Sequence, residues 1–461
     1  MSSVLTAELL EAVSRTVEAR LGLHYPRERW ADLERGLGGA AKELGFKSTE
    51  ACAREMAVSE LDSAQIDSLA AHLTIGETYF FRDPSAFAAL ENQVLPAILQ
   101  ARQGRPGRLR IWSAGCCSGE EPYSIAMALR RSLPDFKHWQ ISILGTDLNP
   151  RFLQKAVHGV YSQWSFRGVC DEVKQAFFRP TKEGRFEVVD EIKRMVEFGS
   201  VNLVEDVYPS LTNNTNAMDV IFCRNVMMYF TREQMRTVVA GLGRSLTENG
   251  WLFVSPTEAS QEQFAGFSPA GFAGTAAYRK GAPASRAAEQ VPAVFAWDVA
   301  PPPPKLPAPE VVTQRAPAAQ INGGRHSHTA EPDHFAEARQ FANEGRLAEA
   351  LAACDKAIGV EKLSAASHYL RGVILHEQNE IEEAAGAIKR ALYLDHDFIV
   401  AHFALGNLML RQGRSGDARR CFENARALLK LQLPETTLPE SDGVTAGRLL
   451  AILASMQEVA A

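Results

Sequence analysis

The sequence lacks the features of a membrane, secreted or metal-binding protein. No apolar run approaches the ~18 residues that span a bilayer. The first ten residues already contain an acid and show no basic start followed by a cleavage site. The seven cysteines are scattered without paired spacing, which argues against a disulfide framework and a zinc site. We therefore expect a cytoplasmic protein with reduced thiols and no metal.

The sequence also lacks an excess of basic charge. Its formal net charge of −6 gives no general attraction to nucleic acid or to a membrane surface. Hydrophobic residues make up 46% and charged residues 23%, which is typical of a globular protein. At 461 residues the chain is too long for one core, so two or three domains are expected.

The pattern of apolar residues changes along the chain. Residues 1–73 have apolar residues at three- and four-residue spacing, which predicts a helical N-terminal domain. Residues 74–282 alternate strand-like and helix-like stretches, the pattern of an open α/β sheet. The strand candidates are Leu109–Trp112, Ile141–Leu144, Asp219–Phe222 and Trp251–Val254. Between them, Arg185–Val189 and Arg194–Phe198 are predicted to pair as a small inserted hairpin.

A proline-rich segment follows the α/β region. Residues 283–332 include the run Pro301–Pro304 and few large apolar residues, so we expect a disordered linker. Beyond the repeats described next, residues 431–461 are predicted to contain an amphipathic capping helix from Gly443 to Val459.

Residues 333–430 contain a repeat with a period of 34 residues. Four columns keep this period: Ala338, Gly372 and Gly406; Ala350, Ala384 and Ala418; Cys354, Ile388 and Phe422; and Ala357, Ala391 and Ala425. The three small columns would let two antiparallel helices approach closely, and the bulkier third column is expected to fill the gap to the next repeat. This pattern resembles three tetratricopeptide repeats, which would bind another protein or fold back on the rest of the chain and regulate it.

A glycine-containing turn follows the first strand candidate. Gly115 and Gly119 lie between that strand and a helix predicted to start near Pro122. In a doubly wound sheet such a turn lies at the carboxyl edge, where ligands bind and where glycine lets the backbone approach them. The second strand candidate leads to Asp147, the usual place for an acid that binds ribose hydroxyls. These positions predict a nucleotide-type pocket.

The charge near this turn limits the ligand. The turn lacks the G-x-G-x-x-G spacing, and Glu120 and Glu121 begin the following helix. Their repulsion disfavours a diphosphate and suits a cationic ligand with ribose hydroxyls, such as S-adenosylmethionine. The alternative is that both acids only complement the dipole of the helix.

Four motifs then identify a family. Thr78–Asp83 (TYFFRD), Trp112–Ser124, Val201–Leu203 and Phe222–Phe230 resemble, in order and spacing, the motifs of CheR-type chemoreceptor methyltransferases. The resemblance implies a class I methyltransferase-like doubly wound sheet behind a helical N-terminal domain. It also implies transfer of a methyl group from S-adenosylmethionine to receptor glutamates, with S-adenosylhomocysteine as product. Such esters belong to adaptation in chemotaxis and related signal transduction.

The resemblance also implies roles for individual residues. Arg82 and Tyr229 would be catalytic, orienting the incoming carboxylate. Glu121 would hold the methionine part of the cofactor and Asp147 its ribose. The complete cofactor set is Gly76, Thr78, Arg82, Gly115, Glu121, Asp147, Asn202, Leu203, Arg224 and Asn225. Gly76 stands where many relatives have asparagine, so one side-chain contact to the cofactor is expected to be missing.

Two other functions remain open at this stage. A methyltransferase acting on a small molecule or nucleic acid is disfavoured because no basic groove is indicated. A non-catalytic scaffold with a degenerate pocket is favoured by Gly76 but opposed by the retained motif residues. The expected partners are the cytoplasmic domain of a chemoreceptor, as substrate, and a further protein at the repeats.

Overall fold

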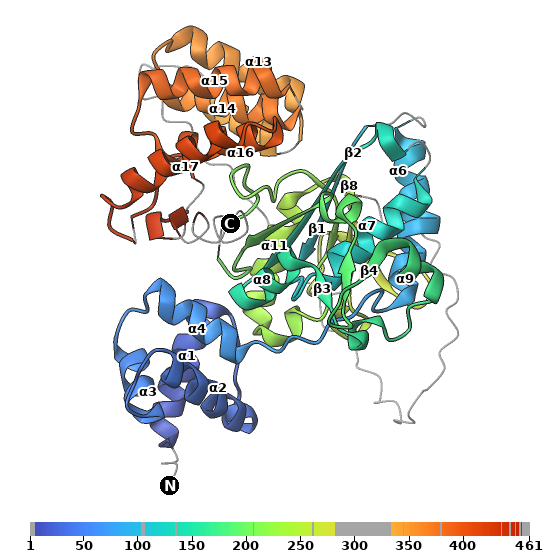
Figure 1. The fold of residues 1–461 in the computed structure, drawn as a ribbon, viewed down its shortest axis with the longest axis vertical. Coiled ribbons are helices and arrows are strands. Elements are labelled where there is room, and N and C mark those ends of the chain that lie inside the picture. Colours follow the sequence, from blue (N-terminus) through green and yellow to red (C-terminus); the bar gives the residue numbers. More distant parts are fainter. Residues whose placement is uncertain are drawn as a thin grey trace, which may run out of the picture.

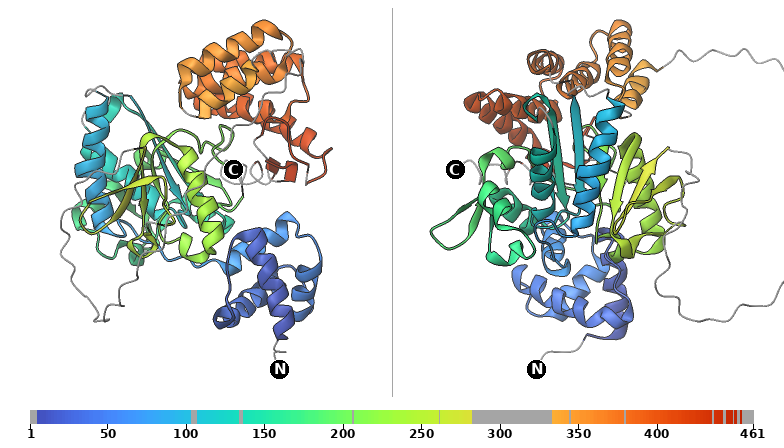
Figure 2. Two further views of the ribbon diagram at one scale, coloured as in Figure 1. Left: turned by 180° about the vertical axis from the view of Figure 1, so that it is seen from behind. Right: turned by 90° about the vertical axis from the view of Figure 1, so that its right-hand side faces the viewer.

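The computed structural model describes residues 5–281 and 333–453, apart from positions 103–106, 134–135, 206, 261, 344, 379, 435, 442–443, 448 and 451–452. Its three parts are a helical N-terminal domain, an α/β domain and a helical repeat module (Figure 1). The helical domain and the repeat module lie at opposite ends of the α/β domain, as the turned views also show (Figure 2). No helix within these described ranges is long and apolar enough to cross a membrane.

Four helices build the N-terminal domain: α1 (Ala7–Leu21), α2 (Trp30–Glu43), α3 (Thr49–Val58) and α4 (Ser63–Leu73). Their ends follow local sequence signals. Asp62 caps α4 in a reciprocal capping box with Gln65, and Gly22 ends α1 in the left-handed conformation at φ 75°. Leucines and alanines at helical spacing, such as Leu33 and Leu37, form a separate buried core. The helical prediction for this region is therefore confirmed.

A seven-stranded sheet forms the α/β domain, in the order β6-β2-β1-β7-β8-β10-β9. Its strands are β1 (Arg108–Ala114), β2 (Gln140–Asp147), β6 (Val196–Ser200), β7 (Met218–Phe222), β8 (Leu246–Val254), β9 (Phe267–Ala270) and β10 (Ala276–Lys280). The first five in spatial order are parallel, and β10 and β9 are antiparallel. All four strand candidates lie in β1, β2, β7 and β8, so these predictions are confirmed.

The sheet has a buried core on each face. Along β1, Leu109 and Ile111 belong to one cluster, whereas Trp112 and Ala114 belong to another. This alternation is the two-residue period of a strand covered on both sides. Helices fill the two faces: α7 (Glu120–Ser132) packs into the first cluster and α11 (Arg232–Ser245) into the second. The remaining helices of the domain are α5 (Pro84–Ala89), α6 (Leu95–Ala101), α8 (Pro150–His158), α9 (Asp171–Phe177) and α10 (Asp190–Lys193).

The predicted inserted hairpin is wrong in its pairing. The first predicted strand corresponds to β5 (Phe186–Val188), which lies in a separate three-stranded antiparallel sheet between β3 (Val160–Tyr161) and β4 (Phe178–Pro180). The second overlaps β6, which joins the main sheet parallel to β2. The two segments are separated by α10, a turn of helix that redirects the chain from one sheet to the other. Local alternation predicted the strands but not their partners.

In the described part of the repeat module, the named helices are α12 (His334–Asn343), α13 (Leu347–Val360), α14 (Ala365–Glu377), α15 (Ile381–Leu394), α16 (Ile399–Arg411) and α17 (Ser415–Leu429). The prediction for the bulky third column needs a correction. A Cβ atom on Gly372 would lie 2.4 Å from Ile388, and one on Gly406 would lie 2.4 Å from Phe422. The bulky side chains therefore fill the space left by glycine within their own repeat. The predicted linker and most of the predicted capping helix lie outside the described residues.

Candidate active site

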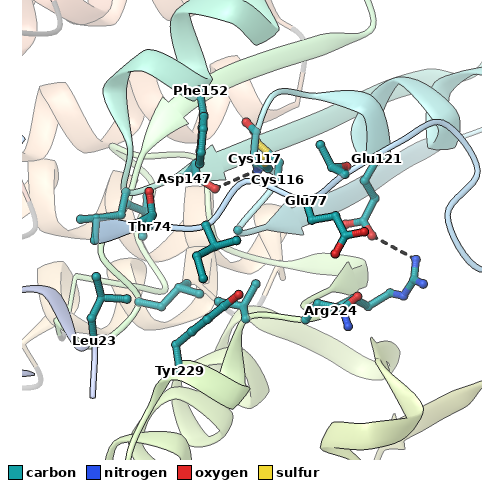
Figure 3. Close-up of a pocket in the computed structure, with 18 of the residues that line it drawn as sticks. Leu23, Thr74, Glu77, Cys116, Cys117, Glu121, Asp147, Phe152, Arg224 and Tyr229 are labelled. Atoms are coloured by element: carbon teal, nitrogen blue, oxygen red, sulfur yellow. Dashed lines mark hydrogen bonds and ion pairs between the residues drawn. The ribbon is translucent and has the colours of Figure 1, made fainter. Parts of the chain in front are cut away.

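One pocket at the carboxyl edge of the parallel strands collects nearly all the predicted site residues (Figure 3). The predicted residues that line it are Thr78, Arg82, Gly115, Glu121, Asp147, Asn202, Leu203, Arg224, Asn225 and Tyr229. Only Gly76 is absent, although its neighbours Ile75 and Glu77 line the pocket. These residues come from four strand ends and from the chain leading out of α4, as expected for an open α/β sheet.

The turn after β1 forms the floor of the pocket. Gly115 adopts φ 77°, and a Cβ atom there would lie 2.3 Å from the Val226 side chain. Gly119, at φ 91°, ends the turn, and α7 begins at Glu120, slightly before the predicted start near Pro122. Glycine is favoured at both positions because other residues rarely adopt this backbone conformation.

Asp147 is fixed at the end of β2. Its Oδ2 accepts a hydrogen bond of 2.8 Å from the backbone N–H of Cys117, and its Oδ1 accepts one of 2.9 Å from that of Asn149. Burial raises the pKa of Asp147 to about 6, against the effect of these backbone donors. The half-buried side chain therefore presents a fixed hydrogen-bond acceptor at the pocket wall.

The two acids at the start of α7 have different surroundings. Glu121 lines the pocket, where its Oε1 accepts from Ser113 Oγ at 2.7 Å and its Oε2 pairs with Arg224 Nη1 at 3.1 Å. Glu120 is 1% exposed and turns inward, accepting from the hydroxyls of Ser118 and Ser165. Of these two acids, only Glu121 can therefore contact a ligand in this pocket.

Arg224 is buried and donates hydrogen bonds to three acceptors. Its side chain is 3% exposed, and besides Glu121 it donates to the Arg82 carbonyl at 3.0 Å and to Asp83 Oδ2 at 3.0 Å. This network joins the strand end of β7 to the segment that carries Arg82. The Arg82 side chain is half-buried and donates to the Glu77 carbonyl. Arg224 therefore orients Glu121 and the Arg82 segment.

The N-terminal domain closes the pocket opposite the sheet. Leu21, Leu23 and Leu73 line it, and the backbone N–H of His24 donates to the Tyr229 carbonyl at 2.8 Å. Asn202 connects the same two parts, because its Nδ2 donates to the Arg20 carbonyl at 2.9 Å. Burial raises the pKa of the Tyr229 phenol, so this hydroxyl remains a hydrogen-bond donor at neutral pH.

Gly76 has a packing explanation. A Cβ atom at this position would lie 2.3 Å from the Phe152 ring and 3.0 Å from Cys117 Sγ. Phe152, in the first turn of α8, lines the pocket beside Asp147. An aromatic ring therefore occupies the space that a side chain at position 76 would take.

The sequence reasoning missed Glu258. This carboxylate is 5% exposed and accepts hydrogen bonds from the backbone N–H groups of Asn225 at 2.8 Å, Met228 at 3.2 Å and Ser255 at 3.1 Å. Asn225 has φ 59°, so Glu258 stabilises an unusual backbone turn beside the pocket. The Ser-x-x-Glu spacing of a capping box, Ser255 to Glu258, was the available signal.

The ionisable groups of the pocket favour a ligand with a positive charge. Three carboxylates (Glu77, Glu121, Asp147) and two guanidiniums (Arg82, Arg224) line it, so the formal charge of the fully ionised wall is 2 − 3 = −1. Burial raises the pKa of Cys117 to about 12, so its thiol is protonated and is not a nucleophile.

These features describe an α/β domain with a charged pocket at the carboxyl edge of its sheet and an appended repeat module. The profile of the family described as CheR methyltransferase, SAM binding domain, matches residues 76–271, and that of the tetratricopeptide repeat matches residues 335–397. The chain is similar to the probable biofilm formation methyltransferase WspC of Pseudomonas aeruginosa, with 30% identity over 78% of this chain and 86% of the relative. The WspC of Pseudomonas putida is 30% identical over 76% and 83% of the two chains. The chemotaxis protein methyltransferase Cher2 of Pseudomonas putida is 38% identical over 41% of this chain and 67% of its own.

The chain therefore belongs to the CheR family of chemotaxis methyltransferases. It is a protein methyltransferase of chemosensory signalling with C-terminal tetratricopeptide repeats. The recognition of both families from the sequence is confirmed.

Proposed function

We propose that the protein methylates glutamate side chains on the cytoplasmic domain of chemosensory receptors, with S-adenosylmethionine as methyl donor. The observation that supports this most strongly is the convergence of Glu121, Asp147, Arg82 and Tyr229 on one pocket. Carboxylates suited to a cationic cofactor and a guanidinium suited to an anionic substrate then line the same cavity. A glutamate ester is the product expected when those two ligands meet.

The residues present fit S-adenosylmethionine. Glu121, already fixed by Ser113 and Arg224, would accept the ammonium group of its methionine part. Asp147 would accept the ribose hydroxyls, and Leu203 with the backbone of Asn202 would border the adenine. When bound, this cofactor supplies an electrophilic methyl group on a positively charged sulfur.

The chain's own residues have little chemistry left to perform. A glutamate carboxylate is already ionised at neutral pH, so no general base is required. Arg82 would hold and orient the incoming carboxylate, and Tyr229 would fix its angle of approach. The leucines of the N-terminal domain would exclude water from the reacting groups. The roles of Arg82 and Tyr229 are therefore to align the carboxylate, whereas the leucines would desolvate it.

A binding titration separates this enzyme from a repeat-based scaffold. We expect the full chain to bind S-adenosylhomocysteine in isothermal titration calorimetry. Asp147→Asn and Glu121→Gln should weaken that binding, whereas Glu120→Gln is expected to have a smaller direct effect because Glu120 faces Ser118 and Ser165. If the wild-type chain does not bind the ligand, the proposed cofactor site is refuted.

The repeats support a second, independent part of the proposal. Tetratricopeptide modules bind proteins or peptides on their extended surfaces. We propose that this module engages a protein of the same chemosensory pathway. Co-purification of pathway components with the full chain, compared with a chain carrying substitutions on the repeat surface, would test it.

A further inference from the structure

The repeat module is docked on the methyltransferase domain through a buried ion-pair cluster. Glu377, the last residue of α14, accepts from Arg110 Nη1 at 2.7 Å and pairs with Arg108. The side chains of Arg110 and Glu377 are only 4% and 7% exposed. Arg108 also donates to the Glu377 backbone carbonyl at 3.1 Å, a group that a helix end leaves without an internal partner. Two cations at the carboxyl end of a helix are favourably placed with respect to its dipole.

A loop of the methyltransferase domain enters the same interface. This connecting loop, residues 201–217, joins β6 to β7, and its residue 206 lies outside the described part of the chain. The core of the repeat module consists of two hydrophobic clusters, and Leu211 packs against both of them. Asn216 Nδ2 donates to the Ala342 carbonyl at 3.4 Å. Arg110 Nη2 donates to the Asn214 carbonyl at 2.9 Å, so one guanidinium contacts both the loop and the repeats.

The contacts fall on the same end of two successive repeats. Ala342 and Glu377 lie at the carboxyl ends of α12 and α14, the first helices of their pairs. We call these two helix ends the docking face. It meets the amino end of β1, whereas the cofactor pocket lies beyond the carboxyl end of the same strand. Seven residues of strand separate the two sites by about 20 Å. The repeats therefore do not cover the pocket.

The connecting loop runs from the docking face to the pocket. Its first residues, Val201 to Leu203, line the pocket, and its last residues contact the repeats. Tyr208 fixes the middle of the loop, because its hydroxyl donates to the Leu203 carbonyl at 2.6 Å and its ring packs against Trp112. A displacement of Leu211 from the repeats would therefore act on the backbone that borders the cofactor.

We infer that the docking face binds the methyltransferase domain of the same chain and, through the connecting loop, is energetically linked to the cofactor pocket. The inference rests on the proposed cofactor site. Docked repeats hold the loop in the form that binds cofactor, and bound cofactor in turn strengthens docking, because such linkage is reciprocal. A partner protein that presents paired guanidiniums and an apolar side chain to the docking face competes with Arg108, Arg110 and Leu211. Its binding lowers the affinity for cofactor.

Two variants of the full chain test the linkage. Glu377→Ala leaves two guanidiniums without their carboxylate, and Leu211→Ser removes the apolar contact of the loop. Glu382→Ala is the matched control, because this exposed glutamate lies on the next helix and loses the same charge. We expect both test variants, but not the control, to raise the dissociation constant for S-adenosylhomocysteine about 5- to 10-fold. Hydrogen exchange in residues 207–217 and 370–377 should also accelerate.

The outcomes separate the inference from the proposed function. Faster exchange with an unchanged dissociation constant refutes the linkage, and unchanged exchange refutes the docking. In the wild-type chain, S-adenosylhomocysteine should slow exchange in residues 370–377, about 20 Å from the pocket. The absence of that protection in a chain that binds the ligand also refutes the linkage, even if both variants fail to fold. Failure of the wild-type chain to bind the ligand refutes the cofactor site itself.

Discussion

Glu258→Gln gives a sharp test of how the pocket is built. The carboxylate accepts hydrogen bonds from the backbone N–H groups of Asn225, Met228 and Ser255 and is 5% exposed. Glutamine retains one oxygen acceptor and presents an NH₂ group in place of the other. At least one buried N–H then faces a donor, which costs about 2 kcal/mol of unfolding free energy. Glu258→Ala removes all three acceptor contacts and should cost about 4 kcal/mol.

Tryptophan fluorescence makes this cost measurable in the full chain. The repeat module from residue 333 onward contains no tryptophan, whereas Trp112 and Trp251 lie in the buried sheet. Urea unfolding followed by this fluorescence therefore reports on the part of the chain before the repeats. The matched control is Glu262→Gln, because Glu262 is 65% exposed and pairs only at the surface with Arg236. Its expected effect is below about 1 kcal/mol.

The same variant should impair ligand binding. Glu258 fixes the left-handed backbone at Asn225 and the amide of Met228, which precedes Tyr229. Loosening of this turn should weaken binding of S-adenosylhomocysteine as well as lower stability. Equal stability and affinity in Glu258→Gln and Glu262→Gln would contradict the role assigned to the buried carboxylate.

Three further predictions concern the pocket. Arg82→Ala should lower methyl transfer about 100-fold or more, because the carboxylate loses its orienting group; near-normal turnover in a labelled-methyl assay would exclude that role. The affinity for S-adenosylhomocysteine should fall as the pH drops through about 6, the raised pKa of Asp147, because protonation removes an acceptor. Between about pH 4 and 6 the ligand-free fold binds the Asp147 proton more tightly than the unfolded chain does. Protonation of Asp147 should therefore raise the free energy of unfolding in this range while it lowers the affinity for the ligand. Ligand titration and urea unfolding at each pH would measure these two opposite effects. Gly76→Ala should cost about 1 kcal/mol through its clash with Phe152, and Phe152→Ala in the same chain should offset that cost in urea unfolding.

Much of the fold follows from local pattern. Parallel strands covered on both faces are nearly continuous apolar runs, so β1, β2, β7 and β8 could be predicted. The partners of a short strand depend on distant segments, which is why β5 was expected to pair with its neighbour in sequence. The 34-residue period predicted the repeats, but the contact between Gly372 and Ile388 within one repeat depends on how the two helices cross.

The sequence predicted the residues of the candidate site that belong to the motifs. The prediction was incomplete for residues that support the pocket without lining it. Asp147 and Glu121 were expected in the pocket because their positions at strand and helix ends are typical of cofactor contacts, and both line it. Glu258 binds backbone amides and does not contact a ligand directly, so the motifs that mark ligand contacts do not include it. Gly76 alone suggests a degenerate pocket, but the Phe152 ring occupies the space that a side chain at this position would take. The pairing of Arg110 with Glu377 joins residues far apart in the chain and could not be predicted.

The most direct test of the central claim is transfer of labelled methyl groups from S-adenosylmethionine to the cytoplasmic domain of a chemosensory receptor from the same organism. We predict incorporation by the wild-type chain, loss of incorporation in Arg82→Ala, and release of the label as methanol in mild alkali, as expected for a glutamate ester. Label that resists alkali, or incorporation that is the same with Arg82→Ala, would contradict the account.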